Sequence, residues 1–158
     1  MEIINKQLLP LQEFMQKTHV NADVLLELGE IIKKGRYVFV ATNEMRSFME
    51  DTGTDFFSIG TQIGEIKKDF MPTPWFIDFL SNNSERKVFI NNKSEWMFLC
   101  GKDIFKKGIE KIEIPKRRGL IFVQNKFNEN LGLAKFMQDA NVPLENILDK
   151  GAYVRKEI

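Results

Sequence analysis

The chain has 158 residues, of which 43% are hydrophobic and 28% charged, and its formal net charge at pH 7 is +1. This composition is typical of a globular protein with one domain or two small ones. No apolar run approaches the ~20 residues that a membrane span needs, and the first residues lack the pattern of a signal peptide. We therefore expect a cytoplasmic protein that does not contact membranes.

The sequence offers little for metal or covalent chemistry. Cys100 is the only cysteine and His19 the only histidine, so neither an internal disulfide nor a structural zinc site is expected. A cysteine nucleophile would also need an oriented base, and no third group is placed to supply that orientation. We interpret Cys100 as a buried core residue and His19 as a loop residue, and we expect no cofactor, no metal and no enzymatic activity.

Charge divides the chain into two halves. Residues 1–84 carry 8 Lys and Arg against 12 Asp and Glu, a net charge of −4, whereas residues 85–158 carry 15 against 10, a net charge of +5. Opposite charges on the two halves indicate two domains with different partners. We place the domain boundary between residues 84 and 85.

The chain begins with two predicted helices, over residues 5–17 and 21–34, because apolar side chains recur there at helical spacing. Asn21 is placed to cap the second helix and Gly35 to end it. Residues 36–42, RYVFVAT, are β-branched or aromatic at most positions, which predicts a strand.

The rest of the first half mixes both kinds of element. Residues 43–53 predict a short helix capped by Asn43, and residues 55–68 predict two short strands. In residues 73–83, a threonine followed by a proline is a typical helix start. Residues 1–84 are therefore predicted to form a small α+β domain.

The second half changes to short strand-like runs separated by turn-forming residues, which predicts a compact β-barrel. Helices are predicted only at residues 101–108 and, less strongly, at 143–150. The runs predicted as strands are residues 86–90, 95–100, 109–114, 119–125, 130–136 and 152–158.

Basic residues recur in this second half, and together they predict a surface that binds a polyanion through its phosphates. On a helix over 101–108, Lys102 and Lys106 would share one face. The alternative is that these lysines only keep a β-rich protein soluble. The basic residues in question are Lys102, Lys106, Lys107, Lys111, Lys116, Arg117, Arg118, Arg155 and Lys156.

Several motifs in order carry a family resemblance. FLCGKDIFKKGI, RRGLIFVQN, LGLAKF and GAYVRKE resemble the PUA domain, an RNA-binding β-barrel. The closing residues, together with FFSIGTQIGEIKK and WFIDFLS in the first half, resemble the Nip-seven family of large-ribosomal-subunit biogenesis factors, in which a pre-PUA domain precedes the PUA domain. The resemblance covers residues 37–157, and the short chain is more similar to archaeal members.

The resemblance implies an α+β protein, with a pre-PUA domain over 1–84 and a PUA domain over 85–158. It implies a non-catalytic, monomeric factor that binds precursor rRNA and ribosome assembly proteins, and that would be nuclear or nucleolar in a eukaryote. The implied RNA-binding residues are Gly101, Lys102, Lys106, Lys107 and Gly108 on the helix, Lys116, Arg117 and Arg118 on the next turn, and Arg155 and Lys156 on the final strand.

Three points stay open at this stage. Residues 136–149 contain no Lys or Arg, so their part in RNA binding is undecided. Phe70, Trp75 and Phe76 are interpreted as core residues, with an exposed aromatic anchor as the alternative. The protein could also be an adaptor with incidental RNA affinity, or an accessory subunit of an RNA-modifying enzyme.

Overall fold

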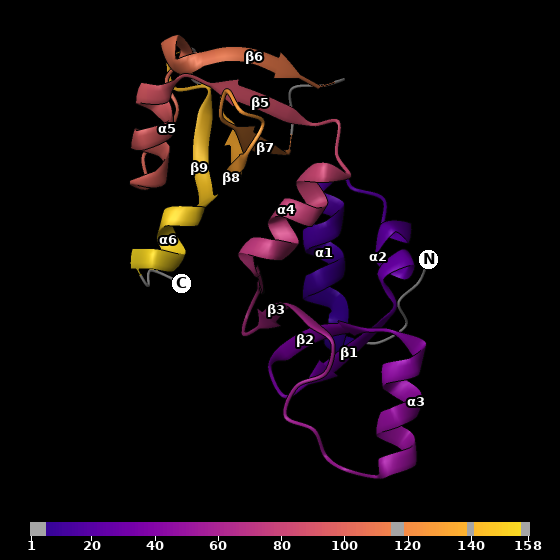
Figure 1. Ribbon diagram of the computed structural model, residues 1–158. Helices are drawn as coiled ribbons and strands as arrows, with labels where there is room; N and C mark the ends of the chain where they lie inside the picture. Colours follow the sequence, from indigo (N-terminus) through magenta and orange to yellow (C-terminus); the bar gives the residue numbers. More distant parts are fainter. Residues whose placement is uncertain (1–5, 115–118, 139–140, 156–158) are drawn as a thin grey trace. The chain divides into compact units, whose positions relative to one another are not determined.

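The computed structural model describes residues 6–114, 119–138 and 141–155. The chain divides into two compact units (Figure 1). The first unit comprises Met1–Gln16 and Val20–Phe76, and the second comprises Lys17–His19 and Ile77–Ile158. No helix in the described ranges combines the length and the hydrophobicity needed to cross a membrane.

The first unit is built on a four-stranded antiparallel sheet in the order β1-β2-β3-β4. Its strands are β1 Glu30–Lys34, β2 Tyr37–Ala41, β3 Thr61–Ile66 and β4 Phe70–Pro72. Its helices are η1 Lys6–Leu8, α1 Leu9–Thr18, α2 Asp23–Leu28 and α3 Asn43–Thr52, and α4 Pro74–Asn82 begins in this unit.

Aromatic side chains fill the core of the first unit. The Phe70 ring packs against Phe14, with ring centroids 5.3 Å apart, and against Phe76, at 5.9 Å. Phe70 and Phe76 are buried, as predicted, whereas Trp75 is 44% exposed. The α4 start is also as predicted, because Thr73 Oγ1 accepts a hydrogen bond from the Phe76 amide at 3.3 Å.

The helix predicted over residues 21–34 is wrong beyond residue 28. Gly29 has φ 133°, which ends α2, and a Cβ atom there would overlap the Ala41 carbonyl. The next five residues form β1, which pairs with β2 through a hairpin turn at Gly35. Ile31 and Ile32 have helical spacing but lie in a strand. Pairing with β2 stabilises their extended backbone by more than the local helical preference disfavours it.

The helix predicted over residues 43–53 is confirmed as α3. Its cap is Thr42 rather than Asn43: Thr42 Oγ1 accepts a hydrogen bond from the Met45 amide at 3.4 Å. Gly53 ends the helix in the left-handed conformation, with φ 58°. Of the two strands predicted over residues 55–68, only β3 forms.

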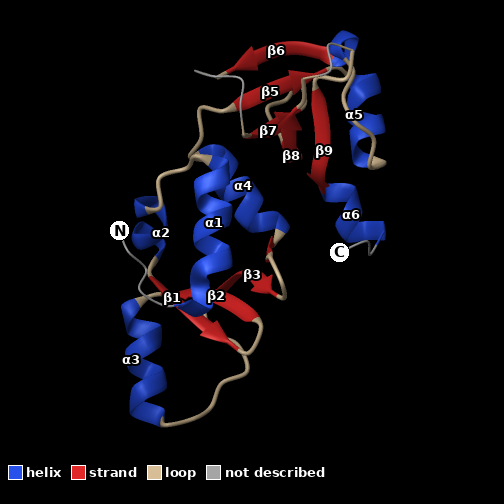
Figure 2. Ribbon diagram, turned by 180° about the vertical axis from the view of Figure 1, so that it is seen from behind, coloured by secondary structure: helices blue, strands red, loops and turns tan. Residues whose placement is uncertain are grey.

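The second unit contains a five-stranded sheet in the order β6-β5-β7-β8-β9, in which β5 and β7 are parallel and the other pairs antiparallel. Figure 2 shows α5 and α6 beside β9. The strands are β5 Lys87–Ile90, β6 Ile109–Glu113, β7 Leu120–Gln124, β8 Asn130–Phe136 and β9 Leu144–Asp149. The helices are α5 Asn92–Leu99, η2 Lys106–Gly108 and α6 Lys150–Arg155.

Two predictions around α5 are wrong. Residues 95–100 were expected to be a strand, but residues 95–99 lie in helix α5 and Cys100 is its C-cap. Asn91 caps the start of this helix by accepting a hydrogen bond from the Ser94 amide at 3.0 Å. Residues 101–108 were expected to be a helix. They form an extended loop with one bridge, Ile104 to Leu144, before the short turn η2.

The two predictions at the end of the chain are also wrong, because strand and helix are exchanged. Residues 143–150, predicted as helical, supply β9, which pairs with β8 along the sheet edge. Residues 152–158 were predicted as a strand, but the described part of this segment, through Arg155, is helix α6. Asp149 explains the switch, since its Oδ1 accepts a hydrogen bond from the Ala152 amide at 3.0 Å and so caps α6.

Candidate nucleic-acid interface

The loop at residues 101–108 brings five of the predicted site residues together. Its backbone is fixed to the segment around β9: the Ile104 amide donates to the Leu144 carbonyl at 2.9 Å, and the Lys106 amide donates to the Asn141 carbonyl at 3.0 Å. Ile104 is buried in the core of the second unit. We call residues 101–108 the lysine loop.

Side chains reinforce this attachment. Asp103 Oδ1 accepts a hydrogen bond from the Asn146 amide at 2.8 Å, and Asn146 Nδ2 donates to the Phe98 carbonyl at 2.8 Å. Asp103, the only acidic residue of the lysine loop, is thus directed to β9. The loop is therefore held in place by groups other than its lysines.

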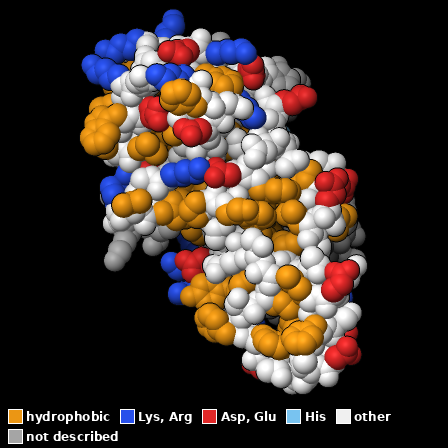
Figure 3. Space-filling model, viewed as in Figure 1, with side chains coloured by type: hydrophobic (Ala, Val, Ile, Leu, Met, Phe, Trp, Pro, Cys, Tyr) orange, Lys and Arg blue, Asp and Glu red, His pale blue; other side chains and the backbone are white. Residues whose placement is uncertain are grey.

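The three lysines of the loop are exposed. Among the described residues, Lys102, Lys106 and Lys107 have no ion-pair partner, and Phe105 between them is 47% exposed. In Figure 3, Lys and Arg side chains gather at the upper left, over the end of the second unit where η2 leads into β6. The loop presents three cations and an aromatic ring to solvent, which suits a phosphate backbone with unpaired bases.

The two predicted glycines have different roles. Gly101 is exposed and has φ 80°, a conformation that favours glycine directly after α5. Gly108 is buried, and a Cβ atom there would overlap Ser94 Oγ and lie 2.9 Å from Ser94 Cβ. Gly108 therefore lets η2 pack closely on α5, a role inside the protein rather than at its surface.

Arg155 lies on α6 rather than on a final strand, and its guanidinium is already engaged. Nη1 and Nη2 donate to the two Asp149 carboxylate oxygens at 3.3 and 3.1 Å, and Nη1 also donates to the Leu99 carbonyl. The Asp149 side chain is only 4% exposed. Burial, and then the nearby Asp149 carboxylate, raises the pKa of the Tyr153 hydroxyl. Arg155 thus compensates a buried charge and joins α6 to α5.

Four predicted site residues lie outside the described residues. They are Lys116, Arg117, Arg118 and Lys156. Their part in RNA binding stays a prediction from the sequence.

Sequence reasoning missed an exposed face of α5. Lys93, Trp96 and Met97 stand three and four residues apart, so they share this face, and Trp96 is 69% exposed. Because residues 95–100 were assigned to a strand, the spacing was not recognised. The cap sequence beginning at Asn91 was the signal that could have revealed it.

Cys100 also differs from its prediction. It is exposed at the end of α5, not buried in the core. Within the described residues, no group of three or more His, Cys, Asp or Glu side chains is placed to hold a metal ion.

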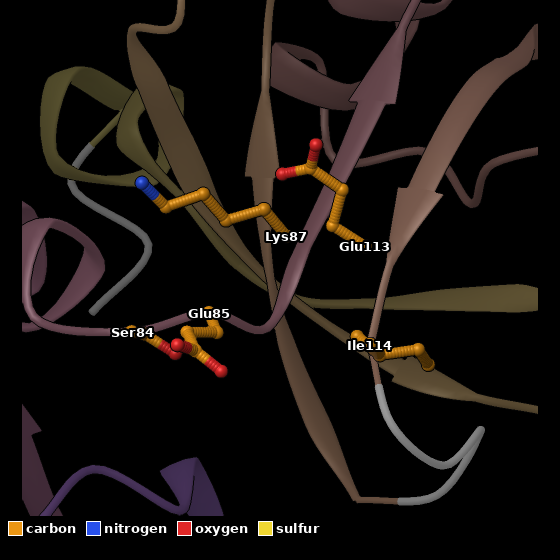
Figure 4. Close-up of a pocket in the computed structure, with 5 residues that line it drawn as sticks. All are labelled: Ser84, Glu85, Lys87, Glu113 and Ile114. Carbon is orange, nitrogen blue, oxygen red and sulfur yellow. The ribbon is translucent and has the colours of Figure 1, made fainter.

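A hollow elsewhere in the second unit is less suited to RNA than the lysine loop. It has a volume of about 510 Å³ and is lined by Ser84, Glu85, Lys87, Glu113 and Ile114. Figure 4 shows the Lys87 and Glu113 side chains extending in different directions from neighbouring strands. With two carboxylates and one ammonium group, this hollow would repel phosphate rather than attract it.

Comparison with known proteins identifies the type of domain in the second half of the chain. Residues 86–158 match the family model of the UPF0113 PUA domain. A UPF0113 protein of Archaeoglobus fulgidus is 30% identical over 107 residues, which are 62% of this chain and 62% of that protein's length.

Two solved archaeal structures are similar in fold. A conserved PUA domain protein from Thermoplasma acidophilum has a TM-score of 0.54 and 15% identity, covering 85% of this chain and 89% of the other. A hypothetical protein from Pyrococcus horikoshii OT3 has a TM-score of 0.50 and 13% identity, covering 92% and 94%. The predicted fold class is confirmed: an α+β protein in which a small N-terminal α/β domain precedes a PUA-type fold.

The lysine loop lies inside the region that matches the PUA model. PUA domains are RNA-binding modules, and the exposed Lys102, Lys106 and Lys107 lie within the matched residues 86–158.

Proposed function

We propose that this protein is a non-catalytic RNA-binding factor of the Nip-seven type, which acts in the processing and assembly of the large ribosomal subunit in the cytoplasm. The PUA domain binds precursor rRNA, and the first unit binds assembly proteins. The observation that carries the proposal is the lysine loop, in which three exposed lysines without an ion-pair partner among the described residues lie on a fixed backbone inside the region that matches the PUA model.

The loop and helix α5 supply two complementary kinds of contact. Lys102, Lys106 and Lys107 would contact phosphates, which gives affinity without sequence preference. Trp96 and Phe105 offer flat apolar surfaces on which unpaired bases can stack. The combination supports single-stranded or loop regions of RNA as the preferred ligand.

The net charge of the first half supports different partners for the two units. Residues 1–84, with a net charge of −4, disfavour contact with phosphate, so we assign protein partners to the first unit. The segment 136–149 has no Lys or Arg and carries three acidic residues, Asp139, Glu145 and Asp149, so we assign it the support of the lysine loop through β9 rather than a contact with RNA.

The test is fluorescence anisotropy of the full chain on a labelled single-stranded RNA across a salt series. Two variants are compared, each replacing two adjacent exposed lysines: Lys106→Ala with Lys107→Ala, and the control Lys67→Ala with Lys68→Ala in the first unit. The first variant is expected to lower the slope of log affinity against log salt by about 1.4, at ~0.7 for each lost phosphate contact. The control is expected to leave the slope unchanged.

Equal slopes for the two variants would contradict the assigned interface. No binding by the full chain at low salt would instead favour the adaptor hypothesis. Competition between transcribed large-subunit precursor rRNA and an unrelated RNA of equal length tests the ribosomal role, because only a preference for the former fits it. A new modified base in the recovered rRNA, detected by mass spectrometry, would contradict the assignment as non-catalytic.

A further inference from the structure

Helix α3 in the first unit exposes its apolar side. None of its ten residues is buried, although Met45, Phe48 and Met49 share one face. Met45 is 45% exposed and Phe48 60%. A helix of this length is marginal from propensity alone and normally depends on packing of its apolar face. This face is available for an additional contact.

The exposed face forms one wall of a groove. The loop that follows α3 returns to β3 and supplies the other wall (Figure 1), and the Phe48 and Phe56 ring centroids lie 5.9 Å apart. Figure 3 shows hydrophobic side chains around a hollow in this lowest part of the view. The groove has a volume of about 420 Å³ and is lined by Glu44, Met45, Phe48, Met49, Phe56, Ser58, Ile59 and Gly60.

Both walls are anchored to the sheet. Arg46 of α3 forms ion pairs with Glu30 of β1 and with Glu50 of its own helix. At the end of the loop, Gly60 has φ 66°, and a Cβ atom there would overlap the Val40 carbonyl. Lys34 of β1 contacts Asp55 in the middle of the loop at 2.5 Å. The groove is thus largely formed before any partner arrives.

The surroundings of the groove are acidic. Residues 42–60 carry four carboxylates, Glu44, Glu50, Asp51 and Asp55, against one basic residue, Arg46, a net charge of −3. Among the described residues, Asp51 has no ion-pair partner. This charge disfavours RNA. It also disfavours a symmetric dimer through the same face, because the carboxylates of two copies would meet.

We propose that this groove binds a short amphipathic helix of a partner protein, with apolar residues facing α3 and Lys or Arg residues flanking them. The apolar walls match an apolar stripe, and the acidic surroundings match basic flanks. Phe48 is the expected main anchor, because it is a large aromatic side chain on the groove wall. The inference rests on the proposed protein-binding role of the first unit, and it names the chemistry of the partner.

The test uses three labelled synthetic peptides and the full chain, with anisotropy as the measurement. The first peptide has leucines three and four positions apart and lysines between them. The second has the same composition in scrambled order, and the third has glutamates in place of the lysines. We expect the first to bind at least about tenfold more tightly than either control, a difference of ~1.4 kcal/mol. Equal affinity for the scrambled peptide would overturn the proposal.

Variants then locate the site. Phe48→Ser is expected to weaken binding of the first peptide by about tenfold or more. The matched control is Phe57→Ser, because Phe57 is 81% exposed in the same loop but does not line the groove. Asp51→Lys, at an exposed position, is expected to weaken binding several-fold without lowering stability. Equal effects of the two serine variants, or a dimer in sedimentation that Phe48→Ser dissociates, would overturn the proposal.

RNA titrations of the same proteins separate this inference from the proposed RNA function. Phe48→Ser is expected to leave RNA affinity unchanged, and the Lys106→Ala, Lys107→Ala variant to leave peptide affinity unchanged. RNA binding without peptide binding would overturn the groove proposal alone. Peptide binding without RNA binding would support the groove and overturn the RNA function.

Discussion

Replacing Gly108 by alanine is expected to destabilise the second unit through one identifiable contact. The added Cβ would overlap Ser94 Oγ and lie 2.9 Å from Ser94 Cβ, against the 3.5–4.0 Å at which carbon atoms pack best. Gly108 cannot easily withdraw, because its amide donates to the Phe105 carbonyl at 2.8 Å and its carbonyl accepts from the Asn91 amide at 3.0 Å. Either η2 or helix α5 must move.

The size of the effect follows from this geometry. Overpacking by one methyl group lowers the free energy of unfolding by about 1–3 kcal/mol, and the rigid surroundings place Gly108→Ala near the upper end. Ser94→Ala removes only the oxygen, so alone it should change stability by ~0.5 kcal/mol or less. Combined with Gly108→Ala, it should restore about 1 kcal/mol, because the remaining carbon–carbon contact is still too short.

The assay is thermal unfolding of the full chain by calorimetry for the four members of this double-mutant cycle. A loss of ~3 kcal/mol corresponds to a fall of roughly 12–24 °C in the melting temperature of a unit of 60–100 residues. Additive effects of Gly108→Ala and Ser94→Ala would refute the assigned contact. Loss of RNA affinity in a double variant with restored stability would refute the internal role of Gly108.

Three further predictions follow from the same unit. Arg155→Ala should lower the free energy of unfolding by ~2 kcal/mol in urea titrations, because it leaves the buried Asp149 carboxylate uncompensated. Arg46→Ala, which removes only exposed ion pairs, should lower it by less than about 1 kcal/mol. Replacing residues 116–118 together by alanine should weaken RNA binding in anisotropy measurements while leaving the melting temperature unchanged; unchanged affinity would contradict a contact between these three basic residues and RNA. The folded protein raises the pKa of Tyr153, so the stabilisation from this residue should be complete below the ordinary tyrosine pKa near 10 and be lost as the pH rises above that pKa. Tyr153→Phe should remove this pH dependence of the free energy of unfolding in urea.

The sequence predicts elements well where local signals agree with the final pairing. The strand at residues 36–42 is rich in β-branched and aromatic residues and becomes β2, and the helix at residues 43–53 has both its start and its stop within a few residues. Prediction fails where pairing with another strand determines the secondary structure of a segment. Leu144, Ile147 and Leu148 have helical spacing, yet they form β9 because the segment pairs with β8, with one register shift along the strand.

The candidate site shows the same division. Charge alone selects Lys102, Lys106 and Lys107, and the structure shows all three exposed. Charge also selects Arg155, but the sequence does not reveal that this residue pairs with the buried Asp149 carboxylate. The exposed Trp96 was missed for a different reason: an error of secondary structure hid the face on which it lies.

The lysine loop is attached to β9 by groups other than its charged lysine side chains. Main-chain hydrogen bonds from Ile104 and Lys106, and the bond from the Asn146 amide to Asp103, order the backbone before RNA arrives. Less conformational entropy is then lost on binding, so a few lysines can give useful affinity. Under the proposed RNA function, β9 would thus influence RNA affinity through the backbone that it holds in place, although it carries no Lys or Arg and contains two acidic residues, Glu145 and Asp149.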